Sequence, residues 1–210
     1  MNLARRLIKG DRTRKTRFHT SNGHLCLKPH EFLRAFGTTL NKIAFGKYSR
    51  TPWLVFSAVD YLAENISGRR VFEFGSGMST VWFAERCAQV VSVESNSGWY
   101  EAIRERSLQL PNVKIIYASS KEDYLDALAA AGDKFDLILV DGLYRSECAR
   151  LARQYLNRGG LIVVDNTDKF PDLAAKVKEL FSDSDIRFFR GWTPGNLHPS
   201  ETSVIERIPV

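Results

Sequence analysis

The chain has 210 residues, 44% of them hydrophobic and 26% charged, which is typical of a globular protein and excludes disordered and fibrous classes. This length allows one well-buried domain with an appendage, but not two ordinary domains. The net charge of +6 arises within residues 1–17, where seven Arg or Lys residues stand against Asp11 alone. We therefore expect a charge-balanced domain preceded by a basic N-terminal arm.

The apolar runs and the cysteines indicate the compartment. No apolar run approaches the ~20 residues of a membrane span, and the first residues lack the apolar segment of a secretory signal. Cys26, Cys87 and Cys148 are isolated and odd in number, which favours a reducing compartment over a disulfide framework. The sequence thus predicts a cytoplasmic protein. Its basic arm is suited to an anionic partner, although a solvated terminus would have the same composition.

Helical spacing begins at residue 29. Apolar residues three to four positions apart, at Phe32, Phe36, Leu40 and Ile43, predict a first helix. A second helix is expected to start with Thr51 as its cap and to run to residue 68. We assign residues 1–50 to the basic arm and a helical cap, and residues 51–210 to the main domain.

The pattern changes at residue 71 to short β-rich runs alternating with helical stretches. The runs cover residues 71–74, 90–94, 113–117, 135–140 and 161–164. Such alternation predicts parallel strands joined by right-handed crossovers, with helices on both faces of the sheet. A helix near 171–181 and two further runs, 185–192 and 201–208, predict a closing antiparallel hairpin. The expected fold is α/β, a doubly wound, mostly parallel, seven-stranded Rossmann-like sheet with an N-terminal helical layer.

Ligands of such sheets bind outside the carboxyl ends of the strands, so the segment VFEFGSGMST at residues 71–80 is a candidate site. Gly75 and Gly77 predict a tight turn that exposes backbone amides to a ligand. Thr80 occupies the place where a dinucleotide fingerprint needs a small residue, which argues against an NAD-dependent oxidoreductase. Glu73 suits a cationic ligand, and Glu94 ends the next strand, where an acid accepts hydrogen bonds from ribose hydroxyls. The pattern indicates a ligand with a ribose and a positive charge.

Four stretches resemble the class I S-adenosylmethionine-dependent methyltransferases. FEFGSG matches their acidic glycine loop, VVSVES their second-strand end, FDLILVDG their fourth-strand motif, and LNRGGLIVVDN their glycine turn into strand five. The resemblance spans about residues 68–208 and implies that S-adenosylmethionine is the cofactor. The residues that it places at the cofactor are Glu73, Gly75, Ser76, Gly77, Glu94, Ser95, Ala118, Ser119 and Asp141. Within this set, Glu94 is matched to the ribose, the region of Ala118 and Ser119 to the adenine, and Asp141 to the reacting end.

Acidic side chains also suggest a metal site. Asp141 and the pair Asp165 and Asn166 follow strands that should be neighbours, ~4.8 Å apart, and their oxygens suit a divalent cation. This arrangement is similar to that of catechol and caffeoyl-coenzyme A O-methyltransferases, and implies Mg²⁺ held by Asp141, Asp165 and Asn166. The alternative is that these acids cap helices or contact solvent. Tyr144 stands where that group has a basic residue.

The expected function is methyl transfer from S-adenosylmethionine, with O-methylation of a small-molecule acceptor and Asp141 as the catalytic residue. DGLY replaces the Asn/Asp-Pro-Pro-aromatic run of enzymes that methylate base nitrogens, which argues against that reaction. Methylation of RNA or another polyanion held by the basic arm remains an alternative, as does a non-catalytic cofactor-binding protein. His30, His198 and Lys169 are candidate general bases, none of them compelling.

Overall fold

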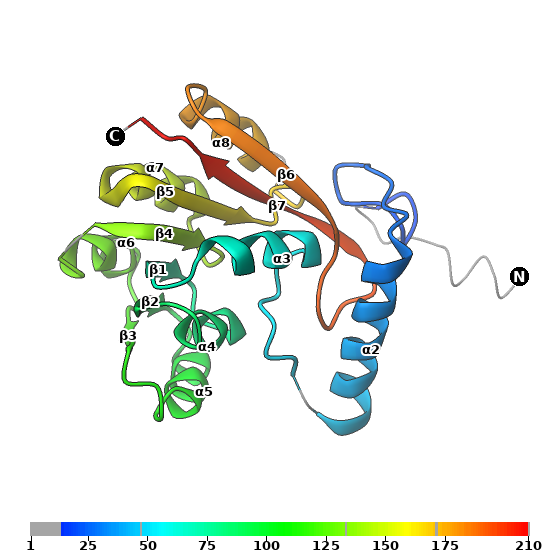
Figure 1. Cartoon of the computed structure of the whole chain (residues 1–210), viewed down its shortest axis with the longest axis horizontal. Coiled ribbons are helices and arrows are strands. Elements are labelled where there is room, and N and C mark those ends of the chain that lie inside the picture. The colour runs from blue at the N-terminus through cyan, green and yellow to red at the C-terminus, as the bar shows by residue number, and fades with distance from the viewer. Residues whose placement is uncertain (1–13, 47, 133, 171, 210) are drawn as a thin grey trace, which may run out of the picture.

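The computed structural model describes residues 14–46, 48–132, 134–170 and 172–209. Residues 1–13, which make up most of the basic arm, lie outside the described residues. One sheet of seven strands runs through the molecule in the order β3-β2-β1-β4-β5-β7-β6, with helices on both faces (Figure 1). The strands are β1 (Arg70–Phe74), β2 (Gln89–Glu94), β3 (Val113–Tyr117), β4 (Phe135–Val140), β5 (Leu156–Asp165), β6 (Asp185–Trp192) and β7 (Pro199–Glu206).

Two helices precede the sheet and the others alternate with its strands. They are α2 (Pro29–Phe45), α3 (Phe56–Asn65), α4 (Met78–Ala84), α5 (Ser97–Arg106), α6 (Lys121–Ala130), α7 (Arg145–Ala152) and α8 (Leu173–Leu180), with a 3₁₀ turn, η1 (Arg153–Tyr155), after α7. None of the helices in the described ranges is both long enough and apolar enough to cross a membrane.

Alternation along the central strands creates two apolar layers. In β1, Phe72 and Phe74 pack with α6, α7 and α8, whereas Val71 packs on the opposite face with α3 and α4. Successive side chains of a strand point to opposite faces, so a strand covered on both sides is apolar throughout. The predicted fold class is confirmed, as is the closing hairpin, because β7 runs antiparallel to both β5 and β6.

The strand order reverses between β1 and β4, which are parallel neighbours although β2 and β3 lie between them in the chain. Crossovers leave this point in opposite directions, so their loops part and open a crevice at the carboxyl ends of the strands. The glycine turn after β1 and Asp141 after β4 meet at this crevice.

The start of the second helix differs from the prediction. Helix α3 begins at Phe56, with Val55 before it, rather than at Thr51. Leu54 and Val55 are fully buried, and the Val55 amide donates a hydrogen bond to Thr202 Oγ1 at 3.2 Å. These contacts hold the residues before α3 in a non-helical conformation. Burying two apolar side chains and pairing an amide stabilises the chain more than one further turn of helix would.

The first helix is confirmed, but it docks through a different face from its apolar stripe. The side chains of α2 that are buried are Glu31, Ala35 and Thr39. Phe36 and Leu40 are about half exposed, and Ile43 is more exposed still. The docking contacts are partly polar, since Glu31 Oε2 accepts a hydrogen bond from the Trp192 amide at 2.9 Å. The division of the chain at residue 50 stays a prediction.

Candidate active site

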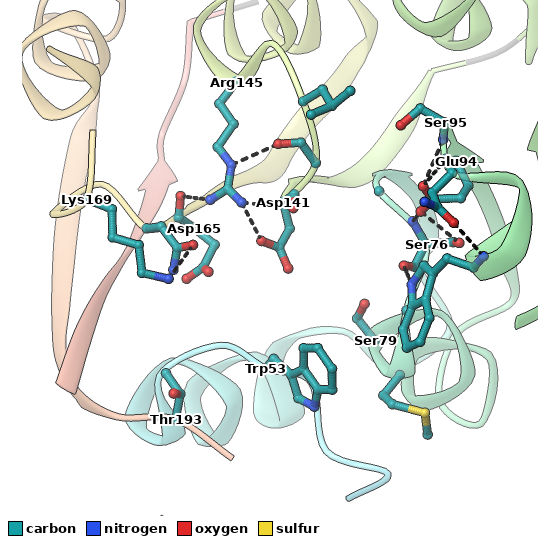
Figure 2. A pocket seen from close by; sticks show the side chains of 18 of the residues that line it. Trp53, Ser76, Ser79, Glu94, Ser95, Asp141, Arg145, Asp165, Lys169 and Thr193 are labelled. Atoms are coloured by element: carbon teal, nitrogen blue, oxygen red, sulfur yellow. Dashed lines mark hydrogen bonds and ion pairs between the residues drawn. The ribbon is translucent and has the colours of Figure 1, made fainter. Parts of the chain in front are cut away.

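A cavity of about 490 Å³ opens at the carboxyl ends of β1, β4 and β5. Its walls come from the turn after β1, the ends of β2, β4 and β5, the segment before α3 and the loop between β6 and β7. This volume is typical of small-molecule sites. Figure 2 shows two groups of side chains in it: Ser76, Glu94 and Ser95 on one side, and Asp141, Arg145, Asp165 and Lys169 on the other.

The two glycines of the first turn have different roles. Gly75 has φ +97°, and a Cβ atom there would lie 2.9 Å from the Gly142 Cα atom, so the turns after β1 and β4 touch through backbone. Gly77 has an extended backbone with φ −174°, and a Cβ atom there would meet only Ser79, at 3.4 Å from its Oγ. Gly77 is therefore not required by the packing of the chain, and the open space beside it is available to a ligand.

Glu73 lies beneath this turn rather than in the cavity. It is fully buried and is not among the described residues that line the cavity, so its contact with the cofactor stays a prediction. Thr80 Oγ1 accepts a hydrogen bond from the Gly77 amide at 2.9 Å and donates one to Glu73 Oε2 at 2.6 Å. Burial raises the pKa of Glu73 to about 8, against the opposing effect of nearby hydroxyl groups. Glu73 thus supports the turn from below through Thr80.

Glu94 lines the cavity and orders three loop residues. Its Oε2 accepts hydrogen bonds from the Ser76 amide at 3.0 Å and from Ser76 Oγ at 3.2 Å. Its Oε1 accepts from the amides of Ser95 and Asn96, both at 2.8 Å. A carboxylate has about four acceptor positions, so a ligand hydroxyl would share or replace one of these donors. The hydroxyl of Ser76 is the donor that can rotate away.

The two residues predicted to border the adenine do not line the cavity. Ala118 is buried, Ser119 is exposed, and neither is among the residues lining the cavity. Asn96 and Trp99 line it instead, and Trp99 Nε1 donates a hydrogen bond to the Ser76 carbonyl at 2.6 Å. The sequence placed neither residue at the adenine, although Trp99 is among the aromatic residues that it offered as walls of an acceptor pocket. Their position directly after the acid that ends β2 was the available signal.

Asp141 faces the cavity from the end of β4 and pairs with Arg145 in the first turn of α7. Arg145 Nη2 lies 3.0 Å from Asp141 Oδ1. The same guanidinium donates to the carbonyls of Gly142, at 3.0 Å, and of Asp165. Burial raises the pKa of Asp141, and the charge of Arg145 opposes this shift. The resemblance leads us to expect a basic residue at position 144, where the chain has Tyr144; the cation that pairs with Asp141 is Arg145, one position further on.

The predicted metal ligands are engaged with protein groups. Asp165 Oδ1 accepts a hydrogen bond from Thr202 Oγ1 at 2.6 Å. The Asn166 side chain donates to Ser200 Oγ at 3.1 Å and accepts from Lys169 Nζ at 3.0 Å. Asp141 is paired with Arg145, and Asn166 accepts from Lys169, so two protein cations already contact oxygens that were predicted to hold a metal ion. The described residues also contain no convergent group of three or more His, Cys, Asp or Glu side chains, so the Mg²⁺ prediction is not supported.

The remaining walls on the Asp141 side are mostly polar. They come from the loop between β6 and β7 and from the segments beside it, and comprise Lys169, Thr193, Asn196, His198 and Ser200. Trp53 also lines the cavity, and Figure 2 shows it between the two groups of side chains. Of the three candidate bases, Lys169 and His198 line the cavity, whereas His30 is exposed on α2.

Comparison with known proteins gives a consistent assignment. Residues 72–167 match the family model of a methyltransferase domain. Among solved structures, one from Klebsiella pneumoniae, provisionally assigned as an O-methyltransferase, is 17% identical with a TM-score of 0.60, and the match covers 84% of this chain and 90% of that one. An rRNA methylase from Streptococcus thermophilus is 15% identical with a TM-score of 0.53, covering 71% and 93%.

A methyltransferase from Pyrococcus furiosus is 17% identical with a TM-score of 0.52, covering 85% of this chain and 97% of that one. At these identities the likeness shows the fold alone. No curated protein matches the chain.

Proposed function

We propose that the chain is a class I methyltransferase, which transfers a methyl group from S-adenosylmethionine to a hydroxyl oxygen of a small molecule. The match of residues 72–167 to the model of a methyltransferase domain supports this proposal. The observation that carries the proposal is the two-part cavity, in which a glycine turn with an ordered Glu94 adjoins a partly buried carboxylate, Asp141. The acceptor assignment rests on the second part, and the cofactor assignment on the first.

The residues present fit S-adenosylmethionine. The space beside Gly77 is open, Glu94 presents acceptors for ribose hydroxyls, and Trp99 and Asn96 offer flat or polar surface next to it. Beneath the turn, Glu73 Oε1 is buried without a hydrogen-bond partner among the described residues. When bound, the cofactor supplies a methyl group activated by its sulfonium. The chain's own task is to position an acceptor and to receive its proton.

Asp141 is the residue assigned to that proton. The Asp141 carboxylate would accept the hydrogen of the acceptor hydroxyl as its oxygen takes the methyl group. Bound S-adenosylmethionine would supply that methyl group, and the electron pair of its carbon–sulfur bond would stay on the sulfur. The raised pKa of Asp141 makes it a better proton acceptor than an exposed aspartate. Arg145 keeps its carboxylate aimed at the cavity. No metal is needed to lower the acceptor's pKa in this scheme.

Two other functions are testable alternatives: methylation of RNA and cofactor binding without catalysis. The rRNA methylase among the structural neighbours shares this fold, and an RNA acceptor would use the basic arm as an electrostatic contact. The volume of the cavity, about 490 Å³, favours a small hydroxyl compound over a polynucleotide as the acceptor. A non-catalytic cofactor-binding protein would bind S-adenosylmethionine without turnover.

Calorimetry with S-adenosylhomocysteine tests the cofactor half. We expect Glu94→Gln to weaken binding by about 1.5–3 kcal/mol, because the amide replaces two acceptor positions with donors. The exposed acid Glu101, on α5, supplies the control Glu101→Gln, which should bind like wild type. Equal affinity in all three proteins would remove the cofactor assignment.

Product formation tests the acceptor half. Phenols, catechols, polyols and short RNAs are offered with isotope-labelled S-adenosylmethionine, and label transfer is measured. Asp141→Asn should abolish transfer while leaving S-adenosylhomocysteine binding intact, and Asp126→Asn, at an exposed position of α6, should behave like wild type. Transfer only to RNA would contradict the small-molecule assignment. Loss of activity on exhaustive chelation, restored by Mg²⁺, would contradict the metal-free scheme.

A further inference from the structure

Helix α2 carries an apolar stripe that nothing in the described chain covers. Its members are Leu33, Phe36, Leu40 and Ile43, between 49% and 77% exposed, and we call them the α2 seam. Figure 1 shows α2 at the margin of the molecule, beyond the end of the sheet. The opposite face of the helix is the one docked on the domain, so the seam points away from the protein.

The spacing of the seam is that of a helix–helix contact. Its members are separated by three, four and three residues, the alternation that keeps apolar side chains facing a partner helix. The helix is 17 residues long, enough to present such a seam over several turns. A partner helix therefore fits the seam better than an irregular surface does.

Small residues flank the seam on one side. Gly37 and Ala44 are seven residues apart and exposed. A Cβ atom at Gly37 would meet nothing within 4 Å, so the chain's own packing does not require a glycine there. Glycine inside a helix costs about 1 kcal/mol relative to alanine. Close approach by a second backbone would account for it.

Charge on α2 is turned away from the seam. Arg34 pairs with Asp60 on α3, with Nη1 at 2.6 Å from Oδ2, and Lys42 lies over the rings of Tyr48 and Trp53 at 5.5 Å. Helices that lie on membranes use lysine and arginine beside their apolar face to contact lipid head groups. The cations of α2 are occupied within the domain, which favours an apolar protein partner over an anionic lipid surface.

The exposed apolar area is of the size that a dimer requires. At roughly 150–200 Å² for a fully exposed large apolar side chain, the four residues of the seam present on the order of 400 Å². A specific interface buries about 800 Å² per partner, of which roughly 56–58% is non-polar, so the seam supplies most of the apolar area that one partner contributes. A two-fold contact is self-complementary, so one apolar seam serves both partners.

We propose that the α2 seam is the interface between two copies of this chain. The seam is symmetric in sequence about residue 38, with Leu33 and Ile43 equally far from it and Phe36 and Leu40 likewise. An antiparallel pair of α2 helices therefore sets Phe36 against Leu40 of the second copy and places Gly37 close to its own counterpart. This interface is independent of the proposed methyl transfer.

Sedimentation at micromolar concentration tests the proposal. The wild type should sediment as a dimer, and the double variant Leu40→Glu, Ile43→Glu as a monomer. Its dissociation constant should rise about a hundredfold or more, because the dimer would bury four carboxylates without partners. Leu108→Glu, at an equally exposed leucine outside α2, should remain a dimer. Circular dichroism and S-adenosylhomocysteine binding check that each variant is folded.

Two further measurements locate the contact. Mixing the Glu variant with Leu40→Lys, Ile43→Lys should restore a dimer, since opposite charges then meet. Gly37→Cys should form an intermolecular disulfide on mild oxidation, and Asp126→Cys should not; the native cysteines are all buried.

A wild type that stays monomeric, or a Glu variant that stays dimeric, overturns the proposal. So would a dimer that appears only after residues 1–13 are removed, which would make that segment the occupant. Binding of the wild-type monomer to phosphatidylglycerol vesicles, lost in the Glu variant, would make a membrane the occupant.

Discussion

Gly75 and Gly77 lie two residues apart, yet the structure gives them opposite consequences. Gly75→Ala forces a side chain into positive φ and against the Gly142 backbone, so we expect the free energy of unfolding to fall by about 2 kcal/mol or more. Gly77→Ala meets no such obstacle and should leave stability unchanged while weakening S-adenosylhomocysteine binding. Denaturant titration and calorimetry on both variants check this. Equal destabilisation by the two changes would contradict it.

Glu73 makes stability depend on pH. Its pKa is about 8 in the folded chain and about 4.5 when unfolded. Between these values only the folded state holds the proton, so unfolding releases it and the free energy of unfolding falls as pH rises, by up to about 1.4 kcal/mol per pH unit. Glu73→Gln has no proton to lose. We therefore expect the free energy of unfolding of the variant to rise relative to that of the wild type between pH 5 and pH 8, as measured by denaturant titration. A constant difference between the two proteins over this range would refute the prediction.

At the scale of elements, a buried carboxylate helps to fix α2 to the end of β6. Glu31 accepts a hydrogen bond from the Trp192 amide, and a Cβ atom on Gly191 would lie 1.9 Å from Glu31 Oε2. Glu31→Ala should lower the free energy of unfolding by about 2 kcal/mol, since it leaves a buried amide unpaired. Glu64→Ala, at an exposed acid of α3, should have little effect.

The same contact predicts non-additivity. Gly191→Ala should destabilise the chain in the wild-type background, because its methyl group collides with Glu31. In the Glu31→Ala background the methyl group has room, so the double variant should lose less free energy of unfolding than the two single variants together. Additive losses would show that Gly191 is required for another reason.

At the scale of the whole molecule, residues near the N-terminus contact the main domain. Arg14 is buried, and the Ser21 amide donates to Asp168 Oδ2 at 2.8 Å, beside the acceptor half of the cavity. Removal of residues 1–13 should leave S-adenosylhomocysteine affinity unchanged, because the described cavity lining begins at Trp53. Removal of residues 1–21 also deletes the Ser21 contact and should lower stability. Calorimetry measures the affinity of both deletion variants and denaturant titration their stability. Loss of S-adenosylhomocysteine affinity on removal of residues 1–13 would show that this segment contributes to the cofactor site.

The sequence alone determined the sheet. The apolar runs, their order and the closing hairpin follow from side-chain periodicity and turn residues, which are local properties. The positions of the glycine turn, Glu94 and Asp141 follow as well, because they stand at strand ends. The residues of the helix at 29–45 were also found from periodicity.

Only the tertiary structure decided how these parts face one another. It placed Glu73 beneath the glycine turn, and it placed Trp99 and Asn96, rather than Ala118 and Ser119, at the cavity wall. It also brought Arg145 and Lys169 next to the acidic and amide side chains of the cavity. It also docked α2 through a polar contact and Phe32, leaving the rest of its apolar stripe exposed. Each outcome depends on which distant groups compete for the same donors, acceptors and space, and that competition has no signature in local spacing.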